Sequence, residues 1–190
     1  MDSSANAGAR RVLFLGGARS GKSVAAETRA AVVAGPAGVR YVATAPHRPD
    51  DAEWALRVAE HRSRRPAHWH TVETGDVAAE LGRPGVALVD CLSLWLTRVL
   101  DEAGAWDDAP GATAEVDRRC AALVQAWRTA PGYVIAVSSE VGLGVVPATP
   151  AGRLFRDRLG RLNTAVASAS DEVALVVAGR LLTLTDAGLT

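Results

Sequence analysis

The stretch Gly16-Gly17-Ala18-Arg19-Ser20-Gly21-Lys22-Ser23 decides the fold of this chain. It satisfies the pattern G-x-x-x-x-G-K-[ST], whose glycines let the backbone approach a phosphate and whose N–H groups point at the anion. An apolar run of strand type, residues 11–15, precedes it, and a run of helix formers, residues 24–30, follows it. This context favours a phosphate-binding loop (P-loop) over a glycine-rich turn that binds nothing. The stretch therefore predicts binding of a nucleoside triphosphate.

Three residues of this motif have expected roles in phosphate chemistry. Lys22 is placed to reach the β- and γ-phosphates, and the Ser23 hydroxyl is a candidate ligand for Mg²⁺. Arg19 lies inside the loop, where it either neutralises phosphate charge or braces the loop through a salt bridge.

Composition narrows the function classes further. The chain has 190 residues with 21 Lys plus Arg and 21 Asp plus Glu, so it lacks the basic excess typical of a nucleic-acid-binding protein. No apolar run approaches the roughly 20 residues of a membrane span. The two cysteines, Cys91 and Cys120, have no metal-type spacing and are expected to be reduced core residues. We expect a flexible leader over residues 1–10, a single domain over residues 11–190, and a cytoplasmic location.

Strand patterns alternate with helix patterns along the rest of the chain. Strands are predicted at 39–45, 86–92 and 133–137, helices at 93–102, 113–129 and 150–169, and a hairpin at 173–184. A further helix, which Asp50 could cap, precedes a short extended segment at 69–74. This order predicts an α/β fold of the P-loop NTPase type. Its mostly parallel sheet is flanked by helices on both faces and ends in an antiparallel edge hairpin.

Ligands bind beyond the carboxyl ends of parallel strands, and several polar residues are expected there. Asp90 ends a buried strand, where its carboxylate can bind Mg²⁺ beside Ser23; the alternative is that it caps the next helix or pairs with a base. Thr44 and Glu140 also follow strands. Glu73 and Glu140 either contact ribose, base or Mg²⁺, or are simply exposed acids.

His61 is the candidate nucleophile. It lies in a basic stretch with Arg57, Arg62, Arg64 and Arg65, and guanidinium groups pair well with phosphate oxygens. A neutral imidazole near a phosphate can attack phosphorus. From the residues alone, a solvated surface histidine is the simpler interpretation.

The chain also resembles a known family over nearly its whole length. The P-loop with Ala26-Glu27, and the later runs 41–45, 57–61, 65–69, 89–92, 139–147, 155–157 and 160–163, occur in the order typical of this family. On these stretches the chain is similar to the bifunctional adenosylcobinamide kinase / adenosylcobinamide-phosphate guanylyltransferase family. The P-loop alone is generic. The runs Arg65-Pro66-Ala67-His68-Trp69 and Glu140-Val141-Gly142-Leu143-Gly144-Val145-Val146-Pro147 are specific.

The resemblance implies two reactions in cobalamin biosynthesis. The first phosphorylates the aminopropanol hydroxyl of adenosylcobinamide with ATP or GTP. The second transfers GMP from GTP to that phosphate through a GMP-histidine intermediate, for which His61 is the counterpart. It also implies Mg²⁺ and a homotrimer. The residues implied in nucleotide binding are Gly16, Gly17, Ala18, Arg19, Ser20, Gly21, Lys22, Ser23, Ala43, Thr44, Ala45, Arg62, Ser63, Arg64, Glu73 and Asp90, with Lys22 catalytic as well and Ser23 and Asp90 at the metal.

One departure from the family pattern concerns the nucleophile. Some members have two adjacent histidines, whereas this chain has Glu60 followed by His61, the counterpart of the second. The alternatives are another P-loop small-molecule kinase without a covalent intermediate, a chain that retains only guanylyltransferase activity, and a non-enzymatic nucleotide-binding module. The sequence leaves open whether the kinase step uses ATP or GTP, its general base and the docking surface of the corrinoid.

Overall fold

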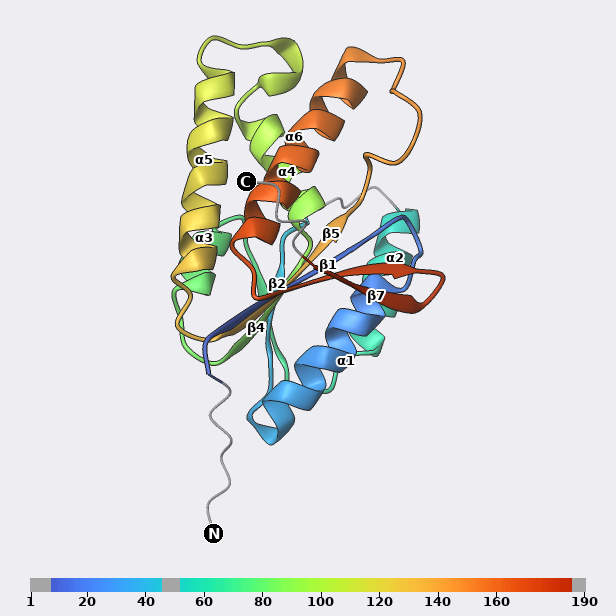
Figure 1. The fold of residues 1–190 in the computed structure, drawn as a ribbon, viewed down its shortest axis with the longest axis vertical. Helices are drawn as coiled ribbons and strands as arrows, with labels where there is room; N and C mark the ends of the chain where they lie inside the picture. Colours follow the sequence, from blue (N-terminus) through green and yellow to red (C-terminus); the bar gives the residue numbers. More distant parts are fainter. Residues whose placement is uncertain (1–7, 46–51, 186–190) are drawn as a thin grey trace.

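The apolar strands of this chain assemble into one seven-stranded sheet in the order β3-β2-β4-β5-β1-β6-β7 (Figure 1). The structure is a computed structural model that describes residues 8–45 and 52–185, without the side chains of Ala52, Glu53, Trp54, Arg57 and His61. The strands are β1 Arg10–Gly16, β2 Arg40–Ala43, β3 His70–Glu73, β4 Val86–Asp90, β5 Tyr133–Ser139, β6 Glu172–Val177 and β7 Arg180–Leu184. The α-helices are α1 Lys22–Ala34, α2 Ala52–Ser63, α3 Val77–Leu81, α4 Leu92–Glu102, α5 Ala112–Arg128 and α6 Pro150–Ser168, with short 3₁₀ turns at Gly35–Ala37 and Ala105–Asp107.

Helices cover both faces of the sheet. Figure 1 shows α1 and α2 on one face, and α3, α4, α5 and α6 on the other. Alternate residues of β1 pack on opposite faces of the sheet. Val12 and Phe14 belong to the hydrophobic cluster that contains residues of α1, and Leu13 and Leu15 belong to the hydrophobic cluster beneath α3 to α6. A strand buried on both faces explains the nearly continuous apolar run in the sequence.

The strand pairing confirms the predicted fold class. β1 lies between β5 and β6 and is parallel to both, and β2 is likewise parallel to β3 and β4. β4 and β5 also pair in parallel, and among the described strands β6 and β7 alone are antiparallel, as the terminal hairpin predicted. This arrangement brings the carboxyl ends of the six parallel strands to one edge of the sheet.

Some predicted boundaries are wrong by one or two residues. β2 ends at Ala43 rather than at Ala45, because the Thr44 side chain bonds the backbone of Cys91 at the end of the neighbouring strand. β4 ends at Asp90 rather than at residue 92, because Cys91 is the N-cap of α4. At the other end of the sheet, β1 begins at Arg10, the last residue expected in the leader; residues 1–7 of that leader lie outside the described ranges.

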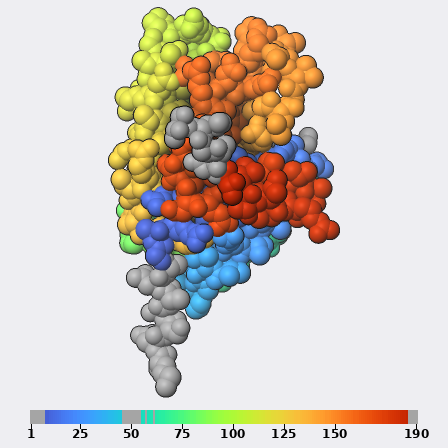
Figure 2. All heavy atoms as spheres, viewed as in Figure 1, coloured from blue at the N-terminus to red at the C-terminus, as the bar shows by residue number. Residues whose placement is uncertain are grey.

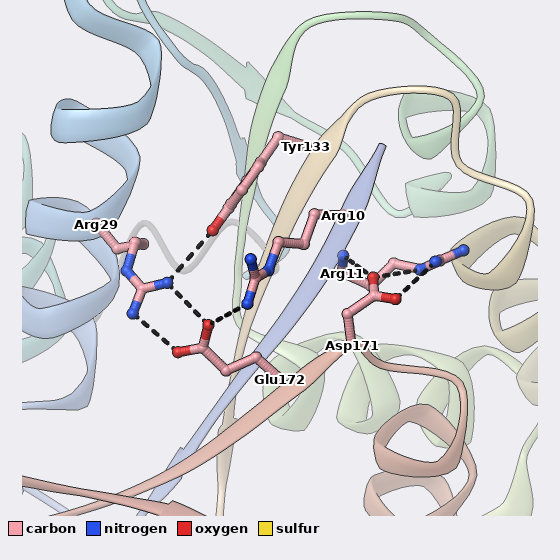
Figure 3. A network of polar contacts seen from close by, with 6 residues as sticks. All are labelled: Arg10, Arg11, Arg29, Tyr133, Asp171 and Glu172. Carbon is pink, nitrogen blue, oxygen red and sulfur yellow. Dashed lines mark hydrogen bonds and ion pairs between the residues drawn. The ribbon is translucent and has the colours of Figure 1, made fainter. Parts of the chain in front are cut away.

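A polar network ties the amino ends of β1, β5 and β6 to α1, far from the P-loop (Figure 3). The Arg29 guanidinium of α1 donates two bonds to Glu172, at 2.8 and 3.0 Å, and one to the Tyr133 hydroxyl. Arg10 donates to the same carboxylate, and Arg11 pairs with Asp171 at 2.9 Å. Arg29 and Arg11 hold the pKa values of Glu172 and Asp171 below their usual range. The network therefore fastens the terminal hairpin to the middle of the sheet.

Two further expectations concern the cysteines and the membrane. Cys91 and Cys120 are both free thiols, and burial raises the pKa of each to about 11, so both are protonated at neutral pH. In the described part of the chain, every helix is too short or too polar to cross a membrane.

Candidate nucleotide-binding site

The glycine-rich motif forms the turn between β1 and α1 that its pattern predicted. Gly21 has φ +94° and is the N-cap of α1, a conformation that side chains with a Cβ rarely adopt. A Cβ on Gly16 would lie 2.6 Å from the Val176 carbonyl oxygen, so only glycine fits between β1 and β6. Arg19 also has a positive φ, of 55°. These constraints leave the loop N–H groups at the start of a long helix, a geometry that binds anions.

A cavity of about 340 Å³ opens at this loop. The loop and the first turn of α1 line one side of it, and Glu60 and Arg64 of the α2 segment line the other. The Lys22 ammonium donates to the Gly17 carbonyl oxygen at 3.0 Å and so folds back over the loop. A cavity with a lysine and two arginines, Arg19 and Arg64, on its walls suits a polyphosphate.

Two neighbouring segments support the P-loop from either side. The Gly179 N–H in the β6–β7 turn donates to the Ser20 carbonyl at 2.8 Å, and the Glu140 N–H donates to the Gly16 carbonyl at 3.1 Å. The Ser20 hydroxyl is buried, and no hydrogen-bond partner for its oxygen is found among the described residues. The β5 end and the β6–β7 turn thus hold the backbone of the loop, while the Ser20 hydroxyl still lacks a hydrogen-bond partner among the described residues.

Asp90 lies at the carboxyl end of β4, where the sequence predicted it, and it has a protein partner. The hydroxyl of Tyr41, in the adjacent strand β2, donates a short hydrogen bond to the Asp90 carboxylate. Tyr41 is 1% exposed, and burial together with Asp90 raises its pKa well above the usual value. The Arg65 guanidinium lies 3.3 Å from the centroid of the Tyr41 ring. Tyr41 therefore connects the carboxylate to the segment after α2.

The residues around Asp90 are also tied to the P-loop and to β2. Burial, with Asp90 beside it, raises the pKa of Cys91, and the Lys22 ammonium acts against this shift, so Lys22 lies within electrostatic reach of the end of β4. Thr44 is fully buried; its hydroxyl donates to the Cys91 carbonyl at 2.7 Å and accepts from the Cys91 N–H. The Thr44 side chain thus holds the backbone of Cys91, where the chain turns from β4 into α4.

The last turn of α2 faces the P-loop. Arg64, just beyond Ser63, donates to Glu27 of α1 at 3.2 Å and to Glu60 at 3.3 Å. Arg62 forms an ion pair with Glu73 at the end of β3, and the Ser63 hydroxyl bonds the Glu60 carbonyl. The His61 backbone follows Glu60 directly in α2, one residue from the wall of the cavity. Its side chain lies outside what the structure describes, as does the Asp50 cap of this helix.

The structure thus brings most of the sequence-predicted site to one edge of the sheet. Ala18, Ala43 and Ala45 lie in the P-loop and at the end of β2. Sequence reasoning missed the roles of Tyr41 and Glu27, and it named Arg65 only among the arginines suited to phosphate, not as a partner of the Tyr41 ring. Tyr41 and Glu27 were visible only as parts of quoted runs; no local pattern connects them with Asp90 or with Arg64.

A family model fits this chain over residues 12–184, that is, from β1 to the end of β7. It describes cobinamide kinase / cobinamide phosphate guanyltransferase. The chain belongs to this family.

Relatives that match nearly the whole chain are named as bifunctional proteins of adenosylcobalamin biosynthesis. The chain is 45% identical to the bifunctional adenosylcobalamin biosynthesis protein CobP of Pseudomonas aeruginosa over 89% of its own length and 94% of the relative's. It is 37% identical to CobU of Salmonella typhimurium, over 88% of its own length and 96% of that protein. The family resemblance inferred from the sequence is therefore confirmed.

A solved structure shares the fold of this family member. An ATPase from the type III secretion system of pathogenic bacteria matches 88% of this chain and 52% of its own chain, with a TM-score of 0.52 and 13% identity. At 13% identity, the similarity extends to the fold alone.

Proposed function

We propose that this protein phosphorylates adenosylcobinamide and then transfers GMP from GTP to the resulting phosphate, giving adenosylcobinamide-GDP and pyrophosphate. Membership of the family and the bifunctional names of relatives matched along nearly their whole length support both activities. The observation that carries the proposal is the cavity shared by the P-loop and the end of α2, because it puts phosphate-binding groups beside the segment that contains His61.

The P-loop holds the triphosphate in this proposal. The N–H groups of residues 16–23 and the amino end of α1 surround the phosphates, and Lys22 exchanges its bond to the Gly17 carbonyl for phosphate oxygens. Arg19 and Arg64 add positive charge from the walls of the cavity. The Ser20 hydroxyl gains a partner when a phosphate oxygen or a water enters the loop.

The residues present fit a Mg²⁺ ion. A hydroxyl, Ser23, and a carboxylate, Asp90, are the hard oxygen donors that this ion takes. No cluster of three His, Cys, Asp or Glu side chains occurs among the described residues. Such a donor set suits an ion held mainly by substrate phosphates and water, which neutralises charge on the phosphates. Tyr41 orients the Asp90 carboxylate in advance.

The remaining nucleotide-binding residues divide into direct and indirect roles. Arg62 and Glu73 pair across the gap between α2 and β3, so they form one polar wall on which a ribose or base can be held. Ala43 and Ala45 offer only backbone and small side chains at the end of β2. The Thr44 hydroxyl is occupied by Cys91, so any contribution of Thr44 to the nucleotide is positional. Ser63 closes the last turn of α2.

The two reactions differ in their nucleophile. In the first, the substrate hydroxyl oxygen attacks the γ-phosphorus, the bond to the β-phosphate oxygen breaks, and the hydroxyl proton passes to solvent. In the second, a nitrogen of His61 attacks the α-phosphorus of GTP and pyrophosphate leaves. A phosphate oxygen of the corrinoid then attacks the same phosphorus, the P–N bond breaks, and His61 is regenerated. Lys22 stabilises the charge that develops on the leaving phosphates.

Product analysis tests this proposal. The purified protein is incubated with adenosylcobinamide, GTP and Mg²⁺, and the corrinoid products are separated and identified by mass. We expect adenosylcobinamide phosphate first and adenosylcobinamide-GDP later. His61→Asn is expected to stop at the monophosphate, whereas Lys22→Ala should form both products about a hundredfold or more slowly. If His61→Asn makes adenosylcobinamide-GDP at the wild-type rate, the assigned nucleophile is wrong; if wild-type protein forms no corrinoid product, the proposed activity is wrong.

A further inference from the structure

Two groups of large apolar side chains are exposed on segments that contact the P-loop, the loop after β5 and the terminal hairpin. Leu143, Val145 and Val146 lie in the loop of residues 141–147, between β5 and α6, and Val145 is 95% exposed. A second group, Val177, Leu181, Leu182 and Leu184, lies on the terminal hairpin. In Figure 2 the light-orange segment before α6 and the red hairpin both lie at the surface. Exposed apolar side chains gathered in this way commonly mark a binding surface.

The 141–147 loop presents its apolar side chains from a braced backbone. At its start, the Gly142 N–H donates to the Glu140 carboxylate at 2.5 Å, and Arg156 of α6 donates to the Gly142 carbonyl at 2.9 Å. At its end, Arg153 of α6 donates to the carbonyls of Pro147 and Ala148 at 3.0 and 2.7 Å. The backbone is therefore held on α6 at both ends while Leu143 and Val145 point their side chains at solvent.

The loop is also continuous with the nucleotide site. It begins directly after Glu140, whose N–H donates to the carbonyl of Gly16, the first residue of the P-loop. β5, which carries the loop, is the immediate neighbour of β1 in the sheet, with Gly16 opposite Ser139. A ligand that rests on the loop is thus placed at the edge of the sheet where the phosphates are held.

We propose that the 141–147 loop is the docking surface for the corrin ring of adenosylcobinamide. This inference rests on the proposed function, because that function requires a large acceptor to bring its hydroxyl to the γ-phosphate. The rim of a corrin macrocycle carries many methyl groups, and Leu143, Val145 and Val146 offer apolar surface to them. The braced backbone lowers the entropy cost of binding, since the loop is already held in place.

A second copy of the chain fits this loop less well than the corrinoid does. A stable protein interface buries about 800 Å² on each partner, and three side chains on one short loop supply only a fraction of that area. The loop instead offers a small apolar surface that adjoins the P-loop through the bond from the Glu140 N–H to the Gly16 carbonyl, so one molecule that reaches the phosphates can rest on it. Oligomerisation through the loop is therefore an outcome that the test must exclude.

The test compares the double variant Leu143→Ser/Val145→Ser with the control Val32→Ser. Leu143 and Val145 are 84% and 95% exposed, so serine leaves the packed core intact; Val32, on α1, is 77% exposed and outside the proposed site. Calorimetric titration measures the affinity for adenosylcobinamide in the presence of a non-hydrolysable GTP analogue, and separately the affinity for the analogue alone. Sedimentation velocity gives the oligomeric state of each variant.

We expect the double variant to bind adenosylcobinamide at least about tenfold more weakly, since each apolar side chain removed from a contact is worth roughly a factor of ten. Its affinity for the GTP analogue and its sedimentation should match those of wild type and of Val32→Ser. Unchanged corrinoid affinity would overturn the proposal, and so would a change in oligomeric state without a change in that affinity. If wild-type protein binds the nucleotide but not adenosylcobinamide, the proposed function itself fails, which is a separate result.

Discussion

The hydrogen bond between Tyr41 and Asp90 makes a sharp prediction for Tyr41→Phe. The substitution removes one hydroxyl from a side chain that is 1% exposed and keeps the ring on which Arg65 stacks. A buried hydrogen bond to a charged group contributes about 2 kcal/mol, so we expect the free energy of unfolding to fall by about that amount. For a domain of this size, this corresponds to a decrease in Tm of roughly 4–8 °C.

The matched control is Tyr133→Phe. Tyr133 is also buried in a central strand, but its hydroxyl bonds Arg29 at 3.3 Å, and Arg29 keeps both of its bonds to Glu172 when that hydroxyl is lost. We expect this variant to lose less than about 1 kcal/mol. Urea unfolding at neutral pH, followed by circular dichroism, measures both changes. Equal losses for the two variants, or no loss for Tyr41→Phe, would refute the argument that Tyr41 holds the Asp90 carboxylate.

The same substitution also tests the proposed metal role of Asp90. Because groups that hydrogen-bond a metal-binding carboxylate orient it, Tyr41→Phe is expected to raise the Mg²⁺ concentration needed for half-maximal GTP binding by about tenfold or more. Tyr133→Phe lies at the far end of the sheet and should leave this concentration unchanged. An unchanged Mg²⁺ requirement in Tyr41→Phe would contradict the assignment of Asp90 to the metal.

Three further predictions concern the P-loop and the terminal hairpin. Gly21→Ala places a Cβ at a φ of +94° and 3.3 Å from the Gly179 Cα, so it should cost about 1–2 kcal/mol of stability and weaken GTP binding in calorimetry. Lys22→Ala should lower the rates of both reactions by about a hundredfold or more while leaving Tm nearly unchanged, since within the described residues the Lys22 side chain donates to the Gly17 carbonyl alone. The arginine partners of Glu172 and Asp171 lower the pKa values of both carboxyl groups. The ion pairs therefore stabilise the fold at neutral pH, and this stabilisation is lost as the pH falls below about 4.5 and the carboxylates become protonated. Glu172→Gln should therefore lose about 2 kcal/mol at pH about 7 and show a shallower loss of stability on acidification in urea titrations; an equally steep acid response would contradict the role of this network.

Local patterns predicted the elements that need no long-range partner. The P-loop, the apolar strand before Asp90 and the terminal hairpin all follow from residue order within short windows, and the structure places each where it was expected. The boundary errors at Thr44 and Cys91 lie at two adjacent strand ends. The Thr44 hydroxyl bonds the Cys91 backbone, a contact that a single-strand pattern does not contain, and Cys91 already begins α4 as its N-cap.

Long-range contacts explain what the sequence did not predict at the site. Tyr41 and Asp90 come from different strands, and Glu27 meets Arg64 only because α2 returns to α1. The approach of the hairpin turn to Ser20 likewise depends on β6 lying beside β1. His61 was identified as a nucleophile by resemblance rather than by its own surroundings, and its role remains a prediction.

The covalent step at His61 is the claim on which the account depends most. The direct measurement is incubation with Mg²⁺ and GTP labelled at the α-phosphate, followed by denaturation and peptide mapping. We predict an acid-labile, alkali-stable label on the peptide that contains His61, absent in His61→Asn and retained in the control His68→Asn. A preparation that forms adenosylcobinamide-GDP but carries no label, or carries it on another residue, would contradict the GMP-histidine route.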